Sequence, residues 1–138
     1  MIQSDESRTA PPALVEYART QIHQVMSRVK GIDFIMICST DGFELGSFSK
    51  ISKYNTSKLA AVSSSILAMV SAFLGEIALT GCQSITLDAE NGKAVLTAVP
   101  AGKHPMVMVT LVAKDVLLGQ LLYELKDASQ NIINRDHS

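Results

Sequence analysis

The feature that most constrains the fold is the long apolar segment Thr56–Thr80. It has helical spacing and holds only two charged residues, Lys58 near its start and Glu76 near its end. A surface helix normally turns one apolar stripe to the core and a wide polar face to solvent. A helix with so little polar surface needs a second partner, and a chain of 138 residues is short for supplying one. We therefore expect a homodimer that works by binding.

At about 100° per residue, this helix divides into two stripes and a remaining arc. We expect the stripe of large residues to pack on the chain's own sheet. Small residues at i, i+4 spacing let another backbone approach closely, so we expect the small stripe to pack on the same helix of a second copy, antiparallel about a two-fold axis. The alternative is that the small stripe faces solvent. The large residues are Leu59, Val62, Ile66, Val70, Phe73 and Ile77, the small residues are Ala60, Ser64, Ala68, Ser71 and Gly75, and Leu67 and Leu74 lie between them on one flank.

The strand-like segment that follows the helix supplies a second self-pairing surface. Cys82–Ala89 carries polar residues and no proline, which indicates an unprotected edge strand that can pair with its copy. A partner protein is then expected on the arc of the helix that the dimer leaves exposed. The predicted dimer interface is Ala60, Ser64, Leu67, Ala68, Ser71, Leu74, Gly75, Gln83, Ile85 and Leu87, and the predicted partner-binding residues are Lys58, Ser65, Met69, Ala72 and Glu76.

The rest of the chain predicts two further helices and four further strands. Turn signals at Thr40-Asp41-Gly42 and at Asn91-Gly92 predict tight hairpins. Asn55 or Thr56 can cap the long helix, and Asp115 can cap the last one. We predict one helix over 12–30 and a last helix that follows Asp115 and ends at about Ile133. The predicted strands are Ile32–Ser39, Phe43–Phe48, Ala94–Val99 and Met106–Ala113. Disordered tails are expected over 1–11 and 134–138.

The predicted fold is an α+β, three-layer domain around a five-stranded antiparallel sheet. The element order is helix-strand-strand-helix-strand-strand-strand-helix, and the tight joins make neighbouring strands antiparallel. Ile32–Ser39, Ala94–Val99 and Met106–Ala113 are apolar on both faces, so they should be central. Phe43–Phe48 and Cys82–Ala89 should be edges. The long second helix should cover one face and the two terminal helices the other.

Three segments carry a resemblance to a known family. They are GIDFIMICSTDGFELGS, KLAAVSSSILAMVSAFLGEI and ENGKAVLTAVPAGKHPMVMVTLVA. In this succession the chain resembles the Roadblock / dynein light chain family over one domain, residues 12–133. The resemblance implies a five-stranded sheet and homodimers that pair through the second helix and the adjacent edge strand. Single-domain bacterial and archaeal members of the family are regulators of Ras-like small GTPases, and eukaryotic members are dynein light chains or scaffolds.

Composition and motifs exclude several other classes of protein. A net charge of -1 without a basic block argues against nucleic-acid binding. Cys38 and Cys82 have no CxxC spacing, so we expect free thiols in a reducing, cytoplasmic setting. Residues 1–11 are polar and lack an apolar segment, so we expect no secretory signal. The uncharged run 59–75 is diluted by serines and sits at the short end of the about 17–25 residues that span a membrane, so we expect no membrane insertion.

The sequence contains no motif for catalysis or for a cofactor. Gly92-Lys93 and Gly102-Lys103 lack the spacing of a phosphate-binding loop, and the three histidines lack a metal-ligand companion. The first functional hypothesis is therefore a non-enzymatic homodimer that binds and regulates a Ras-like small GTPase, without any cofactor. The second is a structural adaptor of the light-chain type that captures a peptide. The third is a small-molecule sensor.

Overall fold

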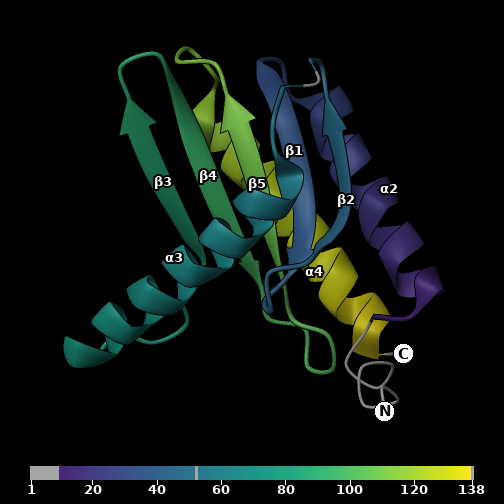
Figure 1. Cartoon of the computed structure of the whole chain (residues 1–138), viewed down its shortest axis with the longest axis vertical. Coiled ribbons are helices and arrows are strands. Elements are labelled where there is room, and N and C mark those ends of the chain that lie inside the picture. The colour runs from purple at the N-terminus through teal and green to yellow at the C-terminus, as the bar shows by residue number, and fades with distance from the viewer. Residues whose placement is uncertain (1–9, 52, 138) are drawn as a thin grey trace.

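The computed structural model describes residues 10–51 and 53–137, which form a five-stranded antiparallel sheet with helices on both faces (Figure 1). The sheet order is β2-β1-β5-β4-β3, so the predicted edge and central strands are confirmed. Residues 1–9 of the tail predicted over 1–11 lie outside the described part of the chain, and the prediction is wrong for Ala10, which packs in the core. The elements are α2 (Pro12–Arg28), β1 (Ile32–Ser39), β2 (Glu44–Ser49), α3 (Thr56–Glu76), β3 (Ser84–Ala89), β4 (Gly92–Val99), β5 (Met106–Val112) and α4 (Leu118–His137).

The ends of α3 show why it begins as predicted and stops earlier. Asn55 caps the helix, because its side chain accepts a hydrogen bond of 3.1 Å from the backbone N–H of Lys58. At the other end Ala78 takes a left-handed conformation with φ 63°, and the Leu79 N–H donates to the Leu74 carbonyl at 2.8 Å. This wraps the chain around the last turn and ends α3 at Glu76 instead of Thr80.

The last helix differs from its prediction at both ends. It begins at Leu118, so Asp115 does not cap it directly, and it continues to His137. The predicted tail over 134–138 is therefore wrong for residues 134–137. The reason is a tertiary contact that spacing alone cannot show. Asp136 is buried, and its carboxylate accepts hydrogen bonds from the backbone N–H groups of Lys103 and His104.

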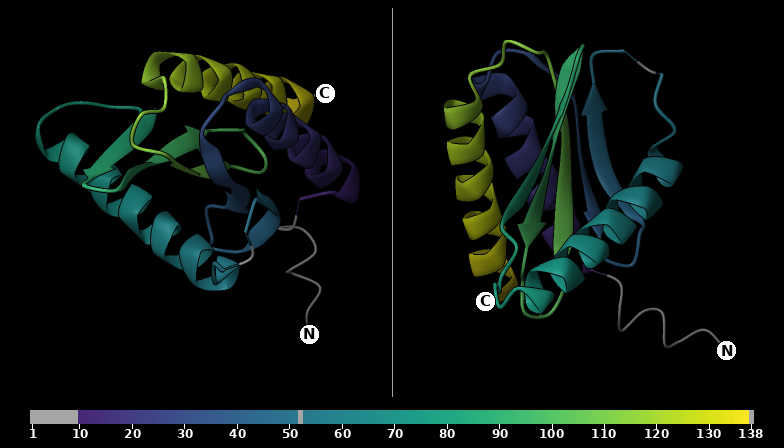
Figure 2. Two further views of the ribbon diagram at one scale, coloured as in Figure 1. Left: turned by 90° about the horizontal axis from the view of Figure 1, so that it is seen from above. Right: turned by 90° about the vertical axis from the view of Figure 1, so that its left-hand side faces the viewer.

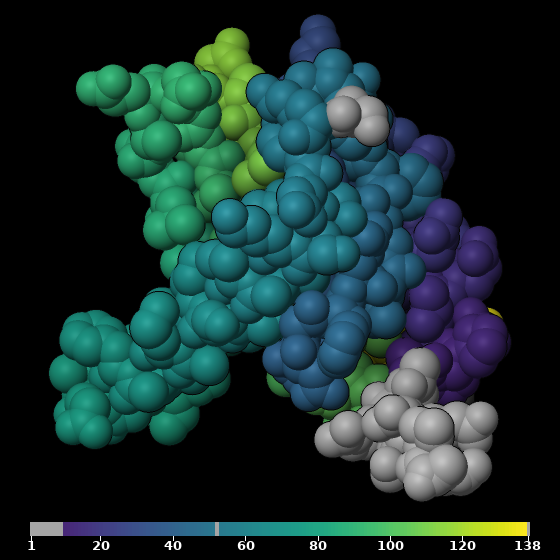
Figure 3. Space-filling model, in the orientation of Figure 1, coloured from purple at the N-terminus to yellow at the C-terminus, as the bar shows by residue number. Residues whose placement is uncertain are grey.

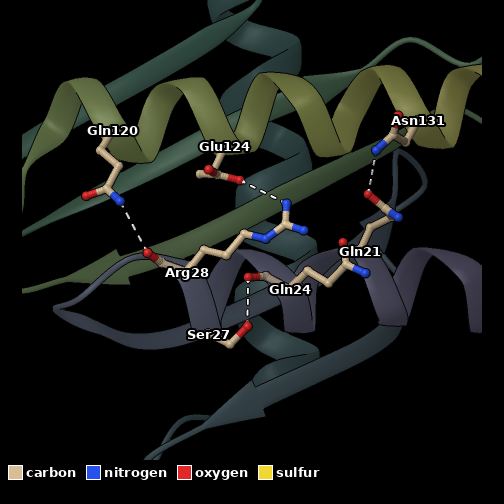
Figure 4. Close-up of polar contacts among 7 residues, drawn as sticks. All are labelled: Gln21, Gln24, Ser27, Arg28, Gln120, Glu124 and Asn131. Carbon is tan, nitrogen blue, oxygen red and sulfur yellow. Dashed lines mark hydrogen bonds and ion pairs between the residues drawn. The ribbon is translucent and has the colours of Figure 1, made fainter.

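The two terminal helices cover one face of the sheet together (Figure 2). Their apolar residues and the facing side chains of β1, β4 and β5 form the larger of two cores, with Ile22, Leu121 and Ile132 each 0 % exposed. Polar contacts join the two helices along their length (Figure 4). Arg28 Nη1 lies 3.4 Å from Glu124 Oε1, and Asn131 Nδ2 donates to Gln21 Oε1 at 2.9 Å.

The opposite face is covered by α3 alone, which crosses the sheet diagonally and extends beyond it (Figures 1 and 3). The contact is made by the first half of the helix. Ala60 and Ser63 are buried, and the Ser64 hydroxyl donates to the Ser39 carbonyl at 3.2 Å. The β1–β2 turn also packs on the helix, since a Cβ on Gly42 would lie 3.3 Å from the Ala61 Cα.

The prediction that the large stripe of α3 packs on the chain's own sheet is wrong for half of the stripe, although Leu59 at its start does pack against the core on this face. The line of α3 that faces the sheet runs through Ala60 of the predicted small stripe and through Ser63 and Leu67, which belong to neither stripe. Small residues there let the helix backbone approach β1 and its turn closely. The large stripe is consequently turned to one side, where Val62, Phe73 and Ile77 are exposed and Leu59, Ile66 and Val70 are half-buried.

Candidate interaction surface on α3 and β3

The second half of α3 carries an apolar surface that the chain itself does not cover. Met69 is 66 % exposed and Phe73 62 % exposed, and Ile77 and Leu79 continue this surface past the end of the helix. Figure 3 shows this part of the helix standing away from the body of the molecule. Large apolar side chains exposed in such a group mark an interaction site more often than isolated ones do.

The edge strand β3 adds a second uncovered element on the same face. Cross-strand partners share a face, and Val95 and Val99 of β4 belong to the core under α2 and α4. Ile85 and Leu87 pair with the intervening residues Leu96 and Ala94, so both lie on the α3 side of the sheet. Leu87 is exposed and Ile85 is half-buried. The sheet is therefore bare on this side near its β3 edge.

The two flanks of α3 face different parts of the molecule. On the flank of the small residues, Ser71 and Gly75 line a hollow of ≈ 450 Å³ together with Thr40 and Pro105 at one end of the sheet. The large stripe lies on the other flank, toward the side of the sheet where β3 is uncovered. We call Val62, Phe73 and Ile77 of α3, together with Ile85 and Leu87 of β3, the exposed apolar face.

The structure divides the predicted dimer residues into two groups. Ala60 is fully buried within the chain, and Ser64 and Leu67 are half-buried against its own sheet. The remaining predicted residues are available to a second copy to different degrees. Ala68, Ser71, Gly75, Gln83 and Leu87 are exposed, and Leu74 and Ile85 are half-buried.

All five residues predicted to bind a partner protein are exposed. Lys58, Ser65, Met69, Ala72 and Glu76 lie on the arc of α3 that points away from the sheet. The prediction missed Val62, Phe73 and Ile77 as surface residues. Their size gave the opposite signal, because in an isolated sequence a large apolar residue is expected in the core.

Ionisable groups in the described residues do not form a catalytic arrangement. No cluster of three or more His, Cys, Asp or Glu side chains that could hold a metal occurs among them. Burial raises the pKa of the Cys38 thiol to about 11, so this buried thiol stays protonated at neutral pH.

The best-defined polar cluster ties the end of α4 to the β4–β5 loop. His104 Nδ1 lies 2.8 Å from Asp136 Oδ1, and Asp136 Oδ2 accepts the backbone N–H groups of Lys103 and His104. Burial by itself would raise the pKa of Asp136, but these hydrogen bonds outweigh it and lower the pKa below its ordinary value. The cluster holds two segments of the fold together.

By length and composition alone, α3 is also apolar enough to cross a membrane. Its packing describes a different situation, because Ala60 and Ser63 are buried against the sheet and Ser64 is bonded to β1. Insertion would require these contacts to break and the polar serines to enter hydrocarbon.

Comparison with known proteins matches the whole architecture. The family model described as Roadblock/LC7 domain matches residues 20–119. No curated protein sequence matches the chain. Among solved structures, MglB of Myxococcus xanthus superposes with a TM-score of 0.80 at 13% identity, covering 91% of this chain and 92% of its own. The gliding protein mglB of Thermus thermophilus superposes with a TM-score of 0.79 at 16% identity, covering 93% of this chain and 94% of its own. A structure described as MglB with a tetrameric arrangement has a TM-score of 0.79 at 16% sequence identity, covering 93% of each chain.

Proposed function

The chain belongs to the Roadblock/LC7 domain family, and on that premise we propose that it is a homodimeric cytoplasmic module that binds and regulates a Ras-like small GTPase. The module has no catalytic role of its own in this proposal. The observation that carries it is the exposed apolar face. Phe73 and Ile77 are exposed on the most apolar helix of the chain, and an apolar surface of this kind is typical of a site that another protein buries.

The geometry of that face favours a second copy as its first occupant. Each large apolar side chain that becomes buried contributes about 1.5–3 kcal/mol to the free energy of association. A few such residues therefore offset the entropy cost of bringing two copies together. A two-fold axis beside β3 would bring the second α3, antiparallel, over the uncovered side of β3. The same operation would pair the two β3 edges into one sheet. The MglB structure described with a tetrameric arrangement is a protein of this fold that self-associates, which supports the proposal.

Dimerisation would leave the outer arc of the two α3 helices for the GTPase. Lys58 and Glu76 supply charge at the two ends of this arc, and Met69 supplies an adaptable apolar centre. The module would act by ordering the switch loops of its partner and fixing the position of the attacking water, which changes hydrolysis without a catalytic residue from the module.

GTP hydrolysis by Ras-like GTPases from the same genome tests this proposal. We expect one of them to bind the dimer in its GTP-bound form, and Met69→Lys to weaken that complex by at least roughly tenfold. Tyr123→Lys is the matched control, because Tyr123 is equally exposed but lies on α4, across the sheet. If no such GTPase binds in either nucleotide state, the proposal is wrong.

The same experiment decides between regulation and a purely structural adaptor. The uncovered β3 edge favours the adaptor, since an open edge can also capture an extended peptide. A partner that binds without any change in its hydrolysis rate, and whose binding survives Met69→Lys, would support this second function.

A further inference from the structure

A second candidate site lies across the sheet from the exposed apolar face. It is a groove of ≈ 530 Å³ between α4, the end of β4 and residues 81–84. Leu122, Leu125 and Ile133 of α4 line it with apolar surface, and Ala98 and Pro100 add to this from β4 and the residue after it. The volume falls within the range of sites that bind one small organic molecule.

The groove contains a buried hydroxyl without a partner. Thr97 lines it and is only 5 % exposed, and its Oγ1 has no hydrogen-bond partner in the described part of the chain. An unpaired buried hydroxyl is unfavourable, so a ligand atom that accepts its proton would gain a hydrogen bond at little cost. Thr110 has the same defect, but it is 0 % exposed and does not line the groove.

The charge of the groove favours an anion. Among the described residues that line it, Lys126 is the only charged one, and no carboxylate accompanies it. Lys126 and Ser129 lie three residues apart, so they share one face of α4. The Ser129 hydroxyl donates to the Ala98 carbonyl at 3.3 Å, which places this part of α4 beside Thr97. Lys126 on α4 and Thr97 on β4 therefore line the same groove.

We propose that this groove binds a small amphipathic carboxylate. Its apolar chain would lie on Leu122, Leu125 and Ile133, and its carboxylate would accept hydrogen bonds from Thr97 Oγ1 and Lys126 Nζ. The inference goes beyond the proposed function and does not rest on it, because the groove and the exposed apolar face lie on opposite sides of the sheet.

Titration of the ¹⁵N-labelled full chain with octanoate, followed by NMR, tests the proposal. We expect saturable shifts confined to residues 81–84, 97–98 and 122–133. The neutral probe 1-octanol has the same chain length, and we expect it to bind roughly 2- to 5-fold more weakly, as for one exposed charge interaction.

Three variants separate the contributions of the site. Thr97→Val removes the unpaired hydroxyl without changing the shape of the side chain, and we expect octanoate to bind roughly 2- to 10-fold more weakly. Lys126→Gln should reduce octanoate binding to the level of octanol. Thr110→Val is the matched control, since it removes the other unpaired hydroxyl outside the groove and should leave binding unchanged.

The proposal is overturned if octanoate causes no shift in the groove at millimolar concentration. It is equally overturned if the shifts centre on Met69 and Phe73, or if octanol binds as well as octanoate. Sedimentation of the same samples reports dimerisation separately. A monomer that binds octanoate would contradict the proposed function alone, and a dimer that does not would contradict this inference alone.

Discussion

The two faces of the sheet are covered by helices of opposite character. On one face α4, with many polar residues, buries Leu121, Leu125, Ala128, Ser129, Ile132 and Asp136. On the other face α3 is the more apolar helix and buries only Ala60 and Ser63. Burial is thus greatest where the helix is amphipathic and shares its face with α2, and least where the helix is apolar and lies alone. Apolar composition beyond what the chain can cover is a sign of association.

The largest expected effect comes from the covered face. Ile22→Ala removes a fully buried side chain from the core under α2 and α4, and leaves a cavity. We expect the free energy of unfolding to fall by about 2–5 kcal/mol, as measured by urea denaturation. Val62→Ala on the exposed apolar face is the control and should cost the isolated chain much less. Equal losses would contradict the contrast between the two faces.

Substitutions in the exposed apolar face should change the dissociation constant of the dimer and leave the free energy of unfolding of the chain nearly unchanged. Phe73→Asp places a charge in the proposed dimer contact, and we expect the dimer dissociation constant to rise roughly 30-fold or more, corresponding to about 2 kcal/mol for a central contact. Sedimentation equilibrium measures the change, and circular dichroism should show that the fold is kept. Tyr123→Asp, at an equally exposed aromatic on α4, should leave the dimer intact.

The Asp136 cluster makes the stability of the face covered by α2 and α4 depend on pH in the acid range. The pKa of Asp136 is lowered in the folded protein, so its ionised form stabilises the fold fully above its ordinary value. This contribution should be lost as the pH falls below about 3.8, through the folded pKa. We expect Asp136→Asn to cost about 1.5–3 kcal/mol near neutral pH and to flatten the acid limb of the stability curve.

Chemical denaturation of the wild-type chain and of Asp136→Asn between pH 2 and pH 7 tests this dependence. Asp127→Asn is the matched control, because Asp127 is exposed on the same helix and its loss should leave the acid limb in place. An acid limb that is unchanged in Asp136→Asn would show that other carboxylates are responsible.

The smallest expected effect distinguishes the two stripes of α3. Ala68 belongs to the small stripe that the sequence predicted to contact α3 of a second copy. Ala68→Leu places a larger side chain there, which would prevent the two helices from packing closely. Because the exposed apolar face lies on the opposite flank, we expect the dissociation constant to change by less than roughly threefold. A large loss of dimer would restore the small stripe as the contact between copies.

Much of the fold could be predicted from local sequence signals. Asn91-Gly92 and Gly42 mark the hairpins, and apolar runs mark the central strands β1, β4 and β5. The end of α4 could not be predicted, because its last turn depends on a hydrogen bond from the backbone N–H of His104, in a loop 32 positions earlier, to the Asp136 carboxylate. The groove beside Thr97 could not be predicted either, since it is formed by segments far apart in the chain.

The sequence by itself determined that α3 has more apolar surface than one sheet contact uses, because composition and period set the width of a helix face. It could not determine which flank is bare. Only the tertiary structure decided that, through the diagonal crossing that brings Ala60 and Ser63 onto the sheet and turns Phe73 away from it. The physical reason is that the crossing depends on how closely two backbones approach, which follows from the shapes of both surfaces together.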